Sequence, residues 1–228
     1  MTENKKFFSN ELAYVVALIT LAIGTALMAT ADFGVSMVVA PAYILHLKIS
    51  EFFPFFSFGM AEYSLQAVIL ILTSILLRRF RISYLFSFIT AFSYGFVLDG
   101  MILLLSLIPE AGFALRIAYY CIGMLLCTAG VSLFFHTYIA PGAYELFVKE
   151  VSSHFGININ KFKTAYDCTS CLLAIVLSFS FFGLWHFEGI KLGTAICTLI
   201  NGALISGWTK FFDRFLRFED KLPLRRFF

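Results

Sequence analysis

Acidic side chains lie inside segments of this chain that are otherwise almost entirely apolar. Asp99 lies deep within one apolar run, and Glu62 and Asp167 each lie about one helical turn after the start of another. An ionised group inside a bilayer costs about 2.5–3.5 kcal/mol or more, so such groups usually face a partner or a water-filled cavity. We therefore expect these carboxylates to favour a cationic or zwitterionic solute, or proton coupling through Asp99.

Other polar residues and two prolines complete the candidate site. Lys163 precedes Asp167 by four positions, which places both on one helix face. Glu145 falls in the first turn after Pro141, where a carboxylate meets the positive end of a helix dipole. The substrate-binding residues that we expect are Asp99, Glu62, Asp167, Lys163, Glu145, Asn201, Pro41 and Pro141.

Several of these residues have a purely structural alternative. Lys163 and Asp167 could form an orienting ion pair at the membrane surface, and Glu145 could simply start a helix. An amide such as Asn201 often joins neighbouring helices by a hydrogen bond. Asp99 has no basic residue within a turn of it on its own helix, which favours a functional role.

The sequence offers little support for catalysis or metal binding. The pair Cys168 and Cys171 lacks a second cysteine pair and a histidine at ligand spacing, so small reduced thiols are expected. The chain has no HExxH motif and no glycine-rich phosphate loop. We therefore expect no enzyme activity, no catalytic residue, no cofactor and no metal.

The composition is that of an all-α polytopic membrane protein. Hydrophobic residues make up 60% of the 228 residues, charged residues 14%, and the mean hydropathy is +0.88. A spanning helix needs roughly 20 apolar residues. The runs of about this length are Leu12–Ala31, Phe58–Leu77, Ser83–Ile108, Ile117–Thr137, Thr164–Trp185 and Leu192–Trp208.

An internal duplication organises these segments. Residues 40–43 (Ala-Pro-Ala-Tyr) recur as residues 140–144 (Ala-Pro-Gly-Ala-Tyr). Each copy opens a short apolar segment, Ser36–Ile49 or Pro141–Val151, which is too short to span and begins beside a proline. The single membrane domain therefore divides into repeats at about 11–107 and 117–212, each with three spanning helices and one half-helix. An odd number of spans inverts the second repeat.

Basic residues indicate the orientation. With the N-terminus inside, fourteen of the seventeen Lys and Arg residues fall on the inner side, the exceptions being Lys48, Arg116 and Lys191. We expect both termini to be cytoplasmic, with a basic tail, residues 213–228, on the anionic inner leaflet. The net charge of +3 belongs to this rim and gives no support for nucleic-acid binding. A secretory signal ending at residues 29–31 is the alternative for the first helix, but the apolar run is long for one.

These motifs resemble those of the YczE/YyaS/YitT-type bacterial membrane proteins. Residues 31–36 (Ala-Asp-Phe-Gly-Val-Ser) are similar to the pattern that ends the first helix of that family. Similar patterns recur at Tyr94-Gly95 with Asp99, at Pro141-Gly142 through Lys163 and Asp167, and at Gly189 through Asn201-Gly202. Where many members carry Pro-Trp-Asp after the first pattern, this chain has Met37-Val38-Val39. The resemblance covers about residues 11–212 and implies a multi-pass inner-membrane protein.

Three functions are consistent with these features. Inverted repeats with half-helices favour a small secondary transporter of an unidentified solute. A solute-binding subunit that needs an energising partner is the second alternative, and a non-transporting scaffold or regulator is the third. The expected partners are the lipid bilayer and a small solute, with a homodimer or an energising subunit as further alternatives. Acidic residues favour a cationic group on the solute, whereas half-helix N-termini favour an anionic one.

Overall fold

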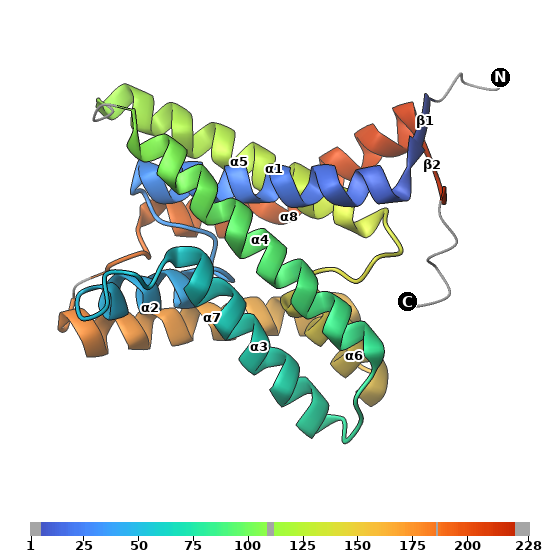
Figure 1. The fold of residues 1–228 in the computed structure, drawn as a ribbon, viewed down its shortest axis with the longest axis horizontal. Coiled ribbons are helices and arrows are strands. Elements are labelled where there is room, and N and C mark those ends of the chain that lie inside the picture. The colour runs from blue at the N-terminus through green and yellow to red at the C-terminus, as the bar shows by residue number, and fades with distance from the viewer. Residues whose placement is uncertain (1–5, 109–111, 186, 222–228) are drawn as a thin grey trace.

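The computed structural model describes residues 6–108, 112–185 and 187–221. In chain order the elements are β1 (Lys6–Ser9), α1 (Asn10–Ala31), α2 (Ala40–Ser50), α3 (Phe58–Leu76), α4 (Ile82–Ser106), α5 (Phe113–Phe135), α6 (Ala143–Phe155), α7 (Ile159–Phe182), α8 (Leu192–Phe215) and β2 (Leu216–Glu219). The helices form an elongated bundle, with α2 and α6 at opposite ends of it (Figure 1).

Six of these helices are long and apolar enough to cross a membrane, which confirms the predicted class. They are α1, α3, α4, α5, α7 and α8. The last of them extends to Phe215, seven residues beyond the predicted end at Trp208, so it is not short for a bilayer. Many large apolar side chains on these helices are exposed, as a lipid-facing surface requires.

The antiparallel helices α1 and α5 form the centre of the bundle. A Cβ on Gly24 would lie 2.7 Å from the Gly123 carbonyl oxygen, and a Cβ on Gly130 would lie 2.9 Å from the Ala17 carbonyl oxygen. Glycines at these points let the two backbones come into direct contact, which is a common way to pack helices in membranes.

The two short helices run in opposite directions from the middle of the bundle. The first residue of α6, Ala143, donates its backbone N–H to the Gln66 side chain at the midpoint of α3. The first residue of α2, Ala40, shares an apolar cluster with Ala174 in the second half of α7. The α2 residue Lys48 then lies over the ring of Phe182, at the end of α7. Each half-helix therefore packs against spanning helices of both repeats.

The two halves are inverted copies in which α1 corresponds to α5, α2 to α6, α3 to α7 and α4 to α8. The packing of α2 on α7 is matched by that of α6 on α3, and the packing of α1 on α4 by that of α5 on α8. Pro41 is the second residue of α2, whereas Pro141 precedes the N-cap residue Gly142 of α6.

The symmetry is broken at one pair of helices. A Cβ on Gly95 of α4 would lie 2.7 Å from the Gly59 carbonyl oxygen of α3, so these helices are in backbone contact. Within the described residues, α7 and α8 make no comparable contact, and a Cβ on Gly202 would meet open space. Gly202 is the repeat counterpart of Gly95. The last two spanning helices therefore pack together in the first repeat and lie apart in the second.

The parallel strands β1 and β2 hold the described ends of the chain together. Lys6 pairs with Leu216 and Ser9 with Glu219. No sequence pattern predicted this small sheet, and its second strand falls within the expected basic tail, residues 213–228. Residues 222–228 of that predicted tail lie outside the described residues. Because both strands lie at the same end of the bundle as α6, this end is called the termini side below and the end with α2 the far side (Figure 1).

Candidate functional site

A small cavity of about 90 Å³ lies at the centre of the bundle, between the two repeats. Its wall includes the residues just before or at the start of both half-helices: Ser36, Val38 and Val39 for α2, and Gly142, Tyr144 and Glu145 for α6. The rest of its polar wall comes from Thr25, Gln66, Thr90, Tyr94, Lys163 and Asn201. The N-terminal ends of two half-helices, one from each repeat, therefore border one cavity.

Hydrogen bonds within the protein hold the start of α6 in place. The Ser87 hydroxyl donates to the Pro141 carbonyl at 2.6 Å, and the Thr90 hydroxyl donates to the Ala140 carbonyl at 3.0 Å. Gln66 accepts the Ala143 N–H at 2.9 Å. The non-helical backbone before α6 is thus satisfied by side chains of α3 and α4, as irregular backbone at membrane depth requires.

A polar cluster behind the cavity joins α3 to α6. The Glu62 carboxylate accepts hydrogen bonds at one oxygen from the Gln66 amide at 3.1 Å and from the Tyr144 hydroxyl at 2.9 Å. Glu62 is completely buried, and its other oxygen has no hydrogen-bond partner among the described residues.

Glu145 and Lys163 are the two charged residues that line the cavity. The Lys163 ammonium lies 3.7 Å from a carboxylate oxygen of Asp167, so the two residues form the ion pair that is the structural alternative to a substrate contact. The positive charge of Lys163 also interacts with the Glu145 carboxyl group. An acid and a base in one wall suit a solute that carries both charges or none.

A larger vestibule of about 820 Å³ adjoins the cavity on the termini side. Phe134, Glu145 and Lys163 line both spaces. The vestibule extends past Pro141 to Arg81, just before α4, and to Lys149 and Glu150 in the middle of α6.

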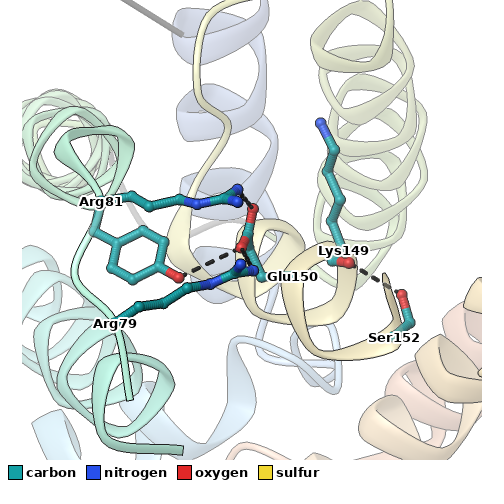
Figure 2. A network of polar contacts seen from close by, with 6 residues as sticks. Arg79, Arg81, Lys149, Glu150 and Ser152 are labelled. Carbon is teal, nitrogen blue, oxygen red and sulfur yellow. Dashed lines mark hydrogen bonds and ion pairs between the residues drawn. The ribbon is translucent and has the colours of Figure 1, made fainter. Parts of the chain in front are cut away.

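An ion-pair network holds α6 to the loop between α3 and α4 at the vestibule rim (Figure 2). The Glu150 carboxylate accepts hydrogen bonds from Arg79 at 2.8 Å and from Arg81 at 3.0 Å, and the Tyr84 hydroxyl lies 3.4 Å from it. The Lys149 side chain extends away from this network (Figure 2). The rim therefore carries a net positive charge.

The structure brings together some of the predicted site residues. Glu145, Lys163 and Asn201 line the central cavity, Pro141 lines the vestibule, and Glu62 lies behind the cavity wall. Asp167 reaches the site through its ion pair with Lys163. Pro41 is buried in the first turn of α2 but lines neither space.

We expected Asp99 to bind solute together with Glu62 and Asp167, and the structure corrects this expectation. Asp99 lines neither the cavity nor the vestibule. Its two carboxylate oxygens accept hydrogen bonds from the Ser57 hydroxyl at 2.6 Å and from the Gly59 backbone N–H at 2.7 Å. The absence of a basic residue nearby on α4 has a physical reason: the carboxylate is satisfied by the N-terminal donors of α3.

Asp32 forms a second ion-pair network on the far side. Its carboxylate oxygens lie 3.1 Å from Arg116 and 2.5 Å from Lys191. Arg116 also donates to the Ala31 carbonyl. These pairs tie the end of α1 to α5 and to the start of α8, so two of the three basic residues that depart from the charge asymmetry have a structural partner here.

Sequence reasoning missed several residues that form the cavity. Tyr94 donates to the Thr25 hydroxyl at 2.9 Å, and both line the cavity. The duplication contained a usable signal for Tyr94, because its repeat counterpart is Asn201. Among the described residues, no group of three or more His, Cys, Asp or Glu side chains is placed to hold a metal ion.

The fold and the cavity define a polytopic α-helical membrane protein with inverted repeats and two half-helices that meet at its centre. The chain belongs to the family of unknown function DUF6198, whose model matches residues 8–210. That range includes all eight described helices except the last turn of α8. No curated protein and no solved structure matches the chain.

Proposed function

We propose that this protein is a small secondary transporter. The observation that carries the proposal is the central cavity, because the N-terminal ends of both half-helices border it and each comes from a different repeat. Secondary transporters with inverted repeats bind their substrates at this place, where interrupted or half-length helices leave polar groups near the bilayer midplane.

The difference between the repeats supports an alternating-access cycle. Helices α3 and α4 are closed against each other, whereas α7 and α8 are apart, and the vestibule opens on the termini side. If the repeats exchange these arrangements, α7 closes on α8, α3 parts from α4, and the cavity opens to the far side. The hydrogen bonds of Asp99 to the start of α3 would then be far-side contacts that break and reform.

The cavity limits the solute to a small polar molecule. A volume of about 90 Å³ holds only a few non-hydrogen atoms. Glu145 and Lys163 together contribute no net charge, so a zwitterion or a neutral polar solute is favoured over an ion. We place both termini and the vestibule in the bacterial cytoplasm, because most Lys and Arg residues lie on the termini side.

Uptake into liposomes tests this function. The purified chain is reconstituted alone and supplied with a library of labelled small amino acids and small polyols, with and without an ion gradient. We expect gradient-dependent accumulation of at least one solute. A solute that binds but is never taken up would favour a binding subunit that needs a partner. If no solute either binds or is taken up, the proposal is wrong and a scaffold role is favoured.

A further inference from the structure

Glu62 is a completely buried carboxyl group with no positive partner. It lies on α3 one turn after Phe58, and its exposed fraction is 0%. One oxygen accepts hydrogen bonds from Gln66 and Tyr144, while the other oxygen is buried without a hydrogen-bond partner among the described residues. Within the described residues Glu62 forms no ion pair, although ion pairs occur on both sides of the bundle.

The ionisable groups that interact with Glu62 are tyrosines and a second carboxyl group. From α6 they are Tyr144 and Glu145, and from α4 the group is Tyr94. Tyr166 of α7 also interacts with Glu62. From α2, Tyr43 and His46 contact the ring of Phe58, and the His46 ring is hydrogen-bonded to the Phe56 carbonyl.

An ionised Glu62 would therefore be an uncompensated charge beside a second carboxyl group. Burial without a positive partner disfavours the charged form, and two interacting carboxyls resist ionising together. The hydrogen bonds fit the neutral form, because the oxygen with two donors can serve as the carbonyl and the oxygen without a partner can carry the proton.

We infer that Glu62 is the proton-carrying site of the transport cycle, and that Glu145 exchanges this proton with the vestibule. The role of this proton in transport rests on the proposed function, whereas the presence of a proton on Glu62 does not. Glu145 lines both the central cavity and the vestibule, whereas Glu62 lines neither.

The transfer is a balanced proton exchange between two carboxyl groups. The O–H bond of Glu62 breaks, an O–H bond forms on the Glu145 carboxylate, and Glu145 then gives the proton to vestibule water. Lys163 lies near enough to Glu145 to stabilise its anion. Because Gln66 and Tyr144 bond Glu62 and also line the cavity, a solute that contacts them changes the environment of the proton.

Infrared spectroscopy of the reconstituted full chain tests the location of the proton without any solute. At neutral pH the wild type should show the carbonyl band of a buried protonated carboxyl group, and Glu62→Gln should lose this band. The control Glu51→Gln, which alters an exposed ion pair with Lys48 on the far side, should keep it. A band that persists in a folded Glu62→Gln protein would overturn the inference.

Tyr144→Phe keeps the test decisive if Glu62→Gln does not fold. This variant leaves Glu62 in place and removes one hydrogen bond from its carbonyl oxygen, so the band should shift to higher frequency. A band at the wild-type frequency would contradict the assignment. A band that is absent in sodium chloride and present in choline chloride would mean that Glu62 binds sodium instead.

Deuterium exchange tests the relay through Glu145. After transfer to D₂O, the Glu62 band should shift, and Glu145→Gln should slow this shift on the order of tenfold or more, because a proton-transfer group is lost from the route. An unchanged exchange rate would remove Glu145 from the route.

Coupling is tested with the solute library in the same liposomes. An inward proton gradient should stimulate uptake by the wild type and by the Glu51→Gln control, and Glu62→Gln should lose the stimulation. Stimulation retained in Glu62→Gln would overturn the inference. If the wild type moves no solute, the proposed transport function fails, while the infrared bands still decide whether Glu62 holds a proton.

Discussion

Ser57 and Asp99 join the far-side start of α3 to α4 through a hydrogen bond of 2.6 Å between the Ser57 hydroxyl and the Asp99 carboxylate. Asp99 also accepts the Gly59 N–H, while the Ser57 hydroxyl accepts the Met60 N–H. The carboxylate therefore satisfies donors at a helix N-terminus and holds two helices in contact. This arrangement explains why an acidic residue is tolerated within an apolar helix.

We expect Asp99→Ala to lower the free energy of unfolding by about 1–3 kcal/mol, because two hydrogen bonds to a charged group are lost. Ser57→Ala should cost less, about 1 kcal/mol, because it removes a single helix cap. The double variant should cost less than the sum, since the two residues share a bond. Thermal unfolding in detergent measures all three, and an additive double variant would contradict the coupling.

The glycine pair Gly95 and Gly202 should respond oppositely to alanine. Gly95→Ala puts a methyl group 2.7 Å from the Gly59 carbonyl oxygen, so the melting temperature should fall. Gly202→Ala meets open space and replaces a poor helix former, so the melting temperature should stay the same or rise. Equal destabilisation of both variants would mean that α7 and α8 are packed together as α3 and α4 are.

The Glu150 network should stabilise α6 against the loop between α3 and α4. Glu150→Gln removes the charge that Arg79 and Arg81 share, and it should lower the free energy of unfolding by about 1 kcal/mol, since both arginines are partly exposed. Lys149 is the neighbouring residue and is exposed, so Lys149→Gln is the matched control and should have little effect on the free energy of unfolding. High salt should reduce the difference between wild type and Glu150→Gln. A difference that is independent of salt would argue against an ionic cause.

Topology is tested by single cysteines in an otherwise cysteine-free chain. We expect a cysteine at Lys48 to react with an impermeant thiol reagent from outside the cell, and one at Lys149 to react only after the membrane is opened. Reaction of both positions from the same side would contradict the inverted arrangement of the half-helices.

The sequence predicts the membrane architecture well, because its signals are local. Six apolar runs, the duplicated Ala-Pro motif and the charge asymmetry together define the spans, the half-helices and the inversion. Lys163 and Asp167 lie on one helix face as their spacing of four residues predicts, and there they form the ion pair given as the structural alternative to a substrate contact.

The contents of the site were harder to predict, because they depend on which helices meet. The position of Asp99 within its own helix gave no indication that the N-terminus of α3 lies against it. The role of Gln66 depends on the depth that α6 reaches, and this depth is set by hydrogen bonds from α4 to residues 140 and 141. Pairing of β1 with β2 joins residues about 210 positions apart, a separation that no local pattern reveals.

The central claim is that one cavity between the half-helices is open alternately to the two sides of the membrane. It is tested most directly by a single cysteine replacing Asn201, in an otherwise cysteine-free chain, with an impermeant thiol reagent added from one side at a time. Cysteines at Lys48 and Lys149 calibrate the reaction for each side. We predict that position 201 reacts rapidly from the termini side, through the vestibule, and more slowly but measurably from the far side. Reaction from one side only, or from neither side, in a chain that labels normally at its two calibrating positions, would contradict the account.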